Sequence, residues 1–221
     1  MDFETIDVLY RSRQTVLQIL KAKGYNTVPY EKFGPFEIEA MATGKKGASL
    51  RMDVTREVPE DSTVASRCIV EYAIPKVKNR LASFVTGLTE TEEGEPAFDY
   101  ATTEVFVLTL ESVSIDSDPF HNTALTLWSN LKLRIGFFDA HALVFNPLEH
   151  VLVPKHELLP PEEHAPLLKS LYTKSKLQLP MIKFHRDPIA RLLGAIPGDI
   201  LRITMPSPQA GETVKYRVCV P

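Results

Sequence analysis

The sequence predicts two domains of different fold class: an α/β domain with a mixed sheet flanked by helices over residues 1–145, and a small α+β domain over residues 146–221. Helix and strand patterns alternate along the first part, which is typical of a mixed sheet flanked by helices. Of the 17 prolines, 11 lie in the last 76 residues. The first part has 15 Lys and Arg against 21 Asp and Glu, whereas the second has 10 against 7. Such a composition shift indicates a domain boundary near Asn146-Pro147.

The first part opens with a pattern typical of an amphipathic helix. Apolar residues from Ile6 to Leu20 recur at helical spacing, and Gly24, after two lysines, is a typical helix end. A short helical or irregular piece is expected around residues 30–42. The other elements expected here are strands at 49–54 and 68–72, a helix at 76–85 opened by Pro75, a central strand at 104–110, a helix at 119–130 opened by Pro119, and strands at 133–138 and 142–145.

The second part mixes short strands with short helices. Asp187 followed by Pro188 is an N-cap signal, and Gly194 is a left-handed stop six residues later, so a helix of about one and a half turns is expected. The other elements expected here are a strand at 151–153, a helix at 161–172, and an antiparallel pair at 199–205 and 214–220 with Arg202, Lys215 and Arg217 facing outward.

The sequence lacks the usual signals of several classes of protein. The chain has no dinucleotide-binding, P-loop or nucleophile-elbow motif, no apolar run long enough to span a membrane, and no secretory signal in its first residues. Its two cysteines, Cys68 and Cys219, favour a reducing compartment. The six histidines lack the spacing of a zinc hydrolase. The sequence therefore predicts no cofactor and no metal site.

Two features leave alternatives open. Asp53 and Glu71 could hold Mg²⁺ as in a nuclease, but Ala73 stands where such an enzyme would need lysine. Four basic residues of the first helix form either a solvated face or a stripe that faces nucleic acid, and two lysines lie on a turn between glycines. These six residues are Arg11, Arg13, Lys21, Lys23, Lys45 and Lys46. Nine acids lie between residues 90 and 118; the stretch TETEEGEPAFD (89–99) is expected to be a solvated loop, and residues 81–131, which have no Lys or Arg, are expected to avoid DNA.

Three C-terminal stretches carry a specific family pattern, with weaker matches in the first helix and around residues 75–85 and 138–150. The stretches are EHVLVPKHELLPPEE (149–163), LPMIKFHRDPIARLLGAIPGDILRI (179–203) and PSPQAGETVKYRVCV (206–220). They closely resemble the shared fifth-largest subunit of eukaryotic RNA polymerases I, II and III, whose last third corresponds to a small subunit of the archaeal polymerase. Met205 stands where an arginine is usual, and the loop at 90–99 has no counterpart. Such drift resembles a divergent copy, from a large DNA virus or a fast-evolving protist.

The resemblance implies a non-catalytic polymerase subunit, nuclear in a cell, or in a cytoplasmic viral factory or virion if viral. Its N-terminal domain would be a jaw of nuclease-like fold that lines the downstream DNA channel through phosphate contacts. Its C-terminal assembly domain would dock on the largest subunit, beside small subunits. The residues expected to bind partners are His150, Pro154, His156, Asp187, Pro188, Arg191, Gly198, Tyr216 and Arg217. The alternative is a free-standing DNA-binding or nuclease-like protein.

Overall fold

The computed structural model describes the chain except for residues 45–49, 59–63, 75, 92 and 115–117. The chain divides into two compact units, Met1–Asn146 and Pro147–Pro221. Each unit has its own four-stranded sheet and its own helices. The architecture is therefore mixed α and β in both units, as predicted.

The sheet of the first unit has the strand order β1-β2-β3-β4. β1 runs antiparallel to β2, whereas β2, β3 and β4 are mutually parallel, so the sheet is mixed. β3 is buried along its whole length, because helices cover both faces of this sheet. The strands are β1 (Met52–Thr55), β2 (Arg67–Ala73), β3 (Thr103–Thr109) and β4 (Arg134–Asp139).

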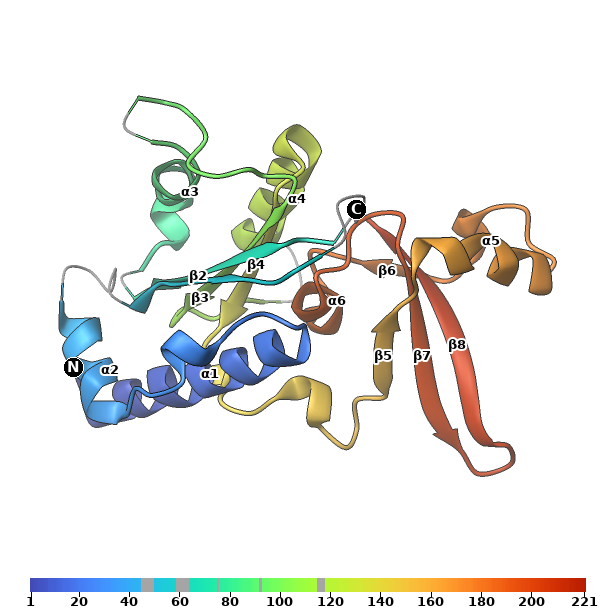
Figure 1. Cartoon of the computed structure of the whole chain (residues 1–221), viewed down its shortest axis with the longest axis horizontal. Helices are drawn as coiled ribbons and strands as arrows, with labels where there is room; N and C mark the ends of the chain where they lie inside the picture. Colours follow the sequence, from blue (N-terminus) through green and yellow to red (C-terminus); the bar gives the residue numbers. More distant parts are fainter. Residues whose placement is uncertain (45–49, 59–63, 75, 92, 115–117) are drawn as a thin grey trace. The chain divides into compact units, whose positions relative to one another are not determined.

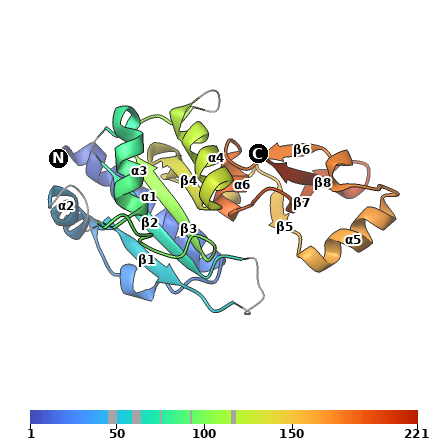
Figure 2. The ribbon, with the colours of Figure 1, turned by 90° about the horizontal axis from the view of Figure 1, so that it is seen from above.

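Helices lie on both sides of this sheet. Figure 1 shows α1 (Phe3–Ala22) and α2 (Pro35–Thr43) on one side, and α3 (Leu81–Thr89) and α4 (Pro119–Leu131) on the other. Figure 2 looks down on the α3 and α4 side, with the sheet behind these helices. The core beneath α3 and α4 combines alternate strand residues with apolar helix residues, among them Ile69, Val105, Val107, Phe137, Leu81, Val85 and Phe120.

Capping groups place two of these helices where the sequence indicated. α1 ends at Ala22, and Gly24 just beyond it has a φ of 86°, which is readily adopted only by glycine. The Asp118 carboxylate caps α4 by accepting from the Phe120 N–H at 3.0 Å, and it also accepts from the Lys78 ammonium at 2.9 Å. Burial by itself would raise the pKa of Asp118, but Lys78 and the backbone N–H groups that the carboxylate binds lower it.

The second unit is built on a sheet of order β5-β7-β8-β6. β7 is antiparallel to both β5 and β8, whereas β6 is parallel to β8. The predicted C-terminal pair and both predicted helices are present. The elements are β5 (Lys155–Leu158), α5 (Pro161–Ser170), β6 (Met181–Lys183), α6 (Pro188–Leu193), β7 (Ile200–Ser207) and β8 (Gly211–Val220).

One expected element is shifted and two are wrong. The helix expected at 76–85 begins as a single turn at Lys78 and runs as α3 to Thr89, and Pro75, expected to open it, lies outside the described residues. The strand expected at 142–145 is a 3₁₀ turn, which the Asp139 carboxylate fixes by accepting from the His141 N–H at 2.9 Å. The strand expected at 151–153 is an exposed turn without a strand partner among the described residues.

Short 3₁₀ helices connect the larger elements. They are η1 (Val28–Tyr30), η3 (Lys78–Arg80), η4 (His141–Leu143), η5 (Pro147–Glu149) and η6 (Lys176–Gln178). Within the part of the chain that the structure describes, no helix has the length and apolar character needed to cross a membrane.

Candidate functional site

The turn before β5 presents two aliphatic side chains to solvent. Val151 is 93% exposed and Leu152 is 83% exposed. The turn is held by His150, whose Nδ1 accepts from the Leu152 N–H at 3.2 Å and whose carbonyl accepts from the Val153 N–H at 2.8 Å. Hydrogen bonds on both sides of Leu152 therefore fix a conformation that leaves apolar side chains in water.

His156 fixes the other end of the same turn. Its Nδ1 lies 2.6 Å from the Pro154 carbonyl oxygen. Because a carbonyl can only accept, Nδ1 carries the proton in this contact. Three residues predicted to bind partners, His150, Pro154 and His156, thus shape one element, which we call the β5 turn (residues 150–154).

The Asp-Pro pair forms the start of α6, as expected. The Asp187 carboxylate accepts from the Ala190 N–H at 2.9 Å, and Gly194 ends the helix with φ of 74°. Arg191 lies on this six-residue helix and is half-buried. Asp187 and Pro188 therefore set the conformation that places Arg191.

Gly198 has a backbone role. Its φ of 99° is outside the range that other residues readily adopt. Its N–H donates to the Cys219 carbonyl at 2.9 Å, and its own carbonyl accepts from the Lys176 ammonium at 2.9 Å. A residue at this position thus ties η6 to the end of β8.

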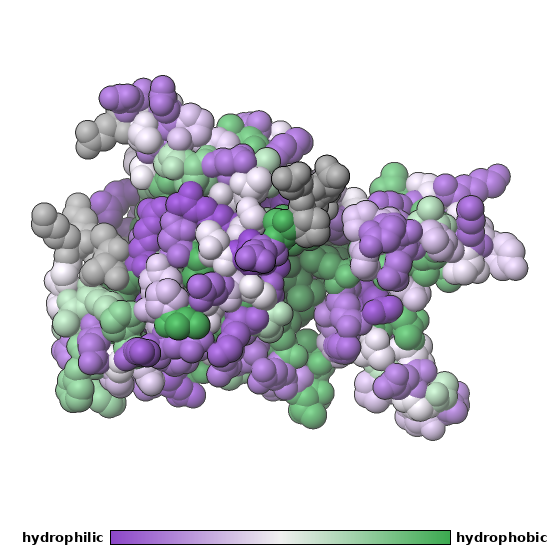
Figure 3. Space-filling view, viewed as in Figure 1, coloured by the Kyte–Doolittle hydropathy of each residue, from purple (hydrophilic) through white to green (hydrophobic). Residues whose placement is uncertain are grey.

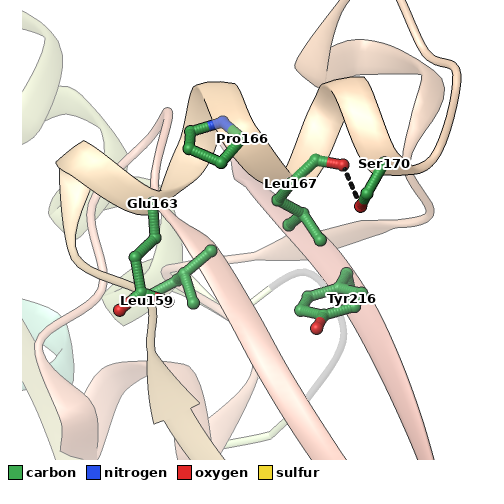
Figure 4. A pocket seen from close by; sticks show the side chains of 6 residues that line it. All are labelled: Leu159, Glu163, Pro166, Leu167, Ser170 and Tyr216. Carbon is green, nitrogen blue, oxygen red and sulfur yellow. Dashed lines mark hydrogen bonds between the residues drawn. The ribbon is translucent and has the colours of Figure 1, made fainter.

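Tyr216 lies at a pocket of about 300 Å³ between α5 and β8, which is lined by apolar side chains together with Glu163 and Ser170. Figure 4 shows Leu167 reaching from α5 toward the Tyr216 ring on β8, and the Ser170 hydroxyl donating to the Leu167 carbonyl at 2.8 Å. Arg217 follows Tyr216 along β8, so its side chain lies on the opposite face of the sheet. The Arg217 guanidinium donates to the Met181 carbonyl at 3.0 Å.

A buried histidine that the sequence did not single out anchors α5. The His164 Nε2 lies 3.0 Å from the Leu159 carbonyl and its Nδ1 lies 2.8 Å from the Lys176 ammonium. Nε2 therefore donates, and Nδ1 accepts from Lys176. A lone histidine on an amphipathic helix has no sequence signal for this role, because its partners come from other segments.

In the first unit, the expectation that four basic residues share an exposed face of α1 is wrong for two of them. Arg13 is buried and donates to the Leu50 carbonyl at 2.8 Å. Lys23 turns toward the sheet and pairs with the buried Glu104 at 2.6 Å. Arg11 and Lys21 are exposed, as expected.

Arg11 and Lys21 lie on a hydrophilic surface. Arg11 is 3.6 Å from the Asp7 carboxylate, and Lys21 is 3.2 Å from the Glu31 carboxylate. On the face that Figure 3 draws, the residues over α1 are mostly hydrophilic. Lys45 and Lys46 lie outside the described residues.

Glu104 is the centre of a buried polar cluster in the first unit. Its carboxylate accepts from Lys23 Nζ at 2.6 and 2.7 Å and from the Tyr25 hydroxyl at 2.7 Å. Burial and the neighbouring Glu104 charge raise the pKa of Tyr25, so the phenol stays protonated and donates. The Arg56 guanidinium lies 4.5 Å from the centre of the Tyr25 ring. The cluster joins α1 to β3.

Known proteins match this chain both over its C-terminal unit and over nearly its whole length. Residues 145–219 match the family model described as RNA polymerase Rpb5, C-terminal domain. A subunit named Rpo5 of a DNA-directed RNA polymerase from Archaeoglobus fulgidus is 54% identical over 76 residues, which are 34% of this chain and 97% of that protein. The Rpo5 subunit of Sulfurisphaera tokodaii is 51% identical over 75 residues, or 34% of this chain and 87% of that protein.

The chain belongs to the Rpb5/Rpo5 family of RNA polymerase subunits. A longer relative is the rpabc1 subunit of DNA-directed RNA polymerases I, II and III from Dictyostelium discoideum. It is 28% identical over 226 residues, which cover 98% of this chain and all of that protein. As an Rpb5/Rpo5 protein, the chain is a non-catalytic subunit.

The carboxylates that could have served a nuclease in this Rpb5/Rpo5 chain are paired with arginines. The Asp53 carboxylate accepts from Arg67 Nε at 2.9 Å, and Glu71 lies 3.6 Å from Arg51. Among the described residues, no group of three or more His, Cys, Asp or Glu could hold a metal ion. Each of these two carboxylates therefore already has a cationic partner within the chain.

Both cysteines of this Rpb5/Rpo5 chain are buried free thiols. Burial raises the pKa of Cys219 to about 12 and that of Cys68 well above its usual value. Their thiolate forms, which would be reactive, are therefore strongly disfavoured.

Proposed function

We propose that the unit from residue 147 onward docks this subunit on the largest subunit of its polymerase, beside small subunits, and that the first unit acts as a jaw that lines the downstream DNA channel. The main support for docking is the length of the archaeal relatives. The matching 75 or 76 residues cover 87% to 97% of these Rpo5 proteins, and the model of the family's C-terminal domain matches residues 145–219 of this chain. A polymerase subunit that consists almost entirely of this unit must make its subunit contacts through it.

The β5 turn supplies the most direct contact surface of this unit. Val151 and Leu152 are almost fully exposed, although their backbone is fixed by His150. Burying a Val or Leu side chain contributes about 1.5–3 kcal/mol. A partner pocket that takes up these two side chains would therefore gain affinity with little ordering cost, because the turn is already formed.

The other residues proposed to bind partners divide into two groups. Asp187, Pro188 and Gly198 shape the backbone, whereas Arg191, Tyr216 and Arg217 offer side chains at or near the surface. We therefore assign to the first group an indirect role in docking. Arg191 is the proposed anchoring charge. If it forms a buried ion pair in the interface, breaking that pair would cost about 2–5 kcal/mol.

Docking through the C-terminal unit is tested by co-expression with the largest subunit. Residues 147–221 alone are expected to co-purify with it as well as the full chain does, and residues 1–146 alone are not. Co-purification of residues 1–146 with the largest subunit, without the C-terminal unit, would contradict the proposal and show that the first unit carries the assembly surface.

For the jaw, Arg11 and Lys21 remain the proposed phosphate contacts. Both are exposed, and their carboxylate partners on the same surface are also partly exposed, so a phosphate can compete for them. Arg13 and Lys23 have no such role, because both are engaged inside the fold. A nuclease-like jaw without nuclease activity also agrees with the arginines beside Asp53 and Glu71.

Charge reversal of Arg11 or of Lys21 is expected to remove one phosphate contact from the assembled polymerase. Each variant is therefore expected to lower the slope of DNA binding against salt concentration by roughly one. Retention is measured against salt concentration on a downstream duplex. Lys174→Glu is the control, because Lys174 is exposed in the other unit and is not among the residues proposed to bind partners. A slope equal to that of the parent complex for both jaw variants would make this face of α1 an ordinary solvated surface.

A further inference from the structure

The outer edge of β8 has no strand partner along most of its length among the described residues. β8 pairs with β7 from Gly211 to Val218, but β6 covers only its last three residues, 218–220. Figure 1 shows the long β7–β8 hairpin extending beyond β6. The hairpin therefore has an open strand edge of seven residues, 211–217, which we call the β8 edge.

The hydrogen bonds at the end of β8 establish which backbone groups point outward. The Cys219 N–H donates inward to the Asp199 carbonyl at 2.8 Å, and the Val218 N–H donates outward to the Pro180 carbonyl at 2.9 Å. Because these directions alternate along a strand, the N–H and C=O groups of residues 212, 214 and 216 also point outward. β6 pairing stops at Pro180 because proline has no N–H with which to continue the ladder.

The pocket between α5 and β8 adjoins this edge. Tyr216 has its backbone groups on the β8 edge and its ring in the pocket, with Leu159 and Leu167 on the other side (Figure 4). In an added strand, the residue directly opposite Tyr216 has its side chain on the same face of the sheet as the ring. An apolar side chain at that position would enter the pocket.

The opposite face of the β8 edge is positively charged. Lys215 and Arg217 are exposed and flank Tyr216, so their side chains lie on the face away from the pocket. An added strand would place the neighbours of its apolar residue beside these two cations. Acidic residues at those two positions complement them, because opposite charges across strands stabilise pairing.

We propose that an extended segment of the largest polymerase subunit adds to the sheet along the β8 edge, with an apolar residue opposite Tyr216 and an acidic residue on either side of it. This inference rests on the proposed docking function and specifies which groups of the two chains would make the contact. Main-chain hydrogen bonds supply affinity in such strand addition, and the pocket supplies specificity.

A proline at position 214 tests the strand addition. Val214→Pro removes an N–H that points outward and leaves the bonds to β7 intact. The hairpin is therefore expected to fold, because proline is tolerated on edge strands. The largest subunit is expected to bind the full-length variant at least about tenfold more weakly than the parent chain. Val214→Thr keeps the N–H and a β-branched side chain, and it is expected to bind within about twofold of the parent.

Amide hydrogen exchange provides a second readout that does not depend on a variant. In the free full-length chain, the amides of residues 214 and 216 are expected to exchange fast and those of 215 and 217 slowly. In the complex with the largest subunit, 214 and 216 are expected to become protected. Assembly without this protection, and with unaltered binding of Val214→Pro, overturns strand addition but leaves docking intact. Failure of the parent chain to bind the largest subunit overturns both.

Discussion

Replacement of Lys23 by methionine is expected to lower the free energy of unfolding of the first unit by about 3–5 kcal/mol. The Lys23 side chain is only 12% exposed, and its partner Glu104 only 4%. The variant leaves the Glu104 carboxylate buried with the Tyr25 hydroxyl as its remaining charge-stabilising donor. An uncompensated buried charge is among the most destabilising single changes in a protein.

The measurement is urea unfolding followed by fluorescence. Trp128 is the single tryptophan and lies on α4, so its emission reports on the first unit. Lys21→Met is the matched control, because Lys21 makes an exposed ion pair with Glu31 and its loss is expected to cost less than about 1 kcal/mol. Equal stabilities of the Lys23→Met and Lys21→Met variants would contradict a structural role for the Glu104 cluster.

Aspartate at both Val151 and Leu152 is expected to weaken binding to the largest subunit by about 3 kcal/mol or more, which is more than about a hundredfold in Kd. The two side chains are exposed in the free chain, so the stability of the isolated subunit is expected to change by less than about 0.5 kcal/mol. The loss of binding then comes from the interface and not from unfolding.

Binding of this variant is measured by titrating the largest subunit with the full-length chain. Leu177→Asp introduces the same charge at another exposed aliphatic residue of the second unit and is expected to bind normally. Binding of the Val151→Asp, Leu152→Asp chain at parental strength would show that the β5 turn lies outside the interface.

Local signals in the sequence were sufficient for elements whose ends depend on neighbouring residues. Pro119 at the start of α4, Asp187 before α6 and Gly24 after α1 act within a few residues of the chain, so local rules placed these three helix ends to within about two residues. Residues 142–145 are apolar enough to have the composition of a strand, but they begin within a turn that the Asp139 carboxylate fixes. β-propensity takes no account of that side-chain contact.

Long-range contacts explain the errors in the candidate site. Lys23 directly follows α1, and its partner Glu104 is 81 residues away on β3. Arg13 bonds to Leu50, 37 residues away. Helical periodicity can assign a residue to a face, but it cannot predict that a basic side chain reaches a buried acceptor on another element. The same limit hides the β8 edge, because its openness depends on where β6 stops.

The family pattern located residues that shape the second unit, but their surface was visible only in the fold. His150 and His156 were expected to bind partners, and both make local bonds that hold the β5 turn. The exposed aliphatic residues of this turn are Val151 and Leu152, which were expected in a strand.

Cross-linking mass spectrometry of the assembled polymerase tests docking through the second unit most directly. Lys155 directly follows the β5 turn and is exposed, and Lys215 lies on the β8 edge. Both lysines are expected to form cross-links to the largest subunit, whereas Lys21 on α1 forms none to it or far fewer. Abundant cross-links from Lys21 to the largest subunit, with none from Lys155 or Lys215, would contradict assembly through the C-terminal unit.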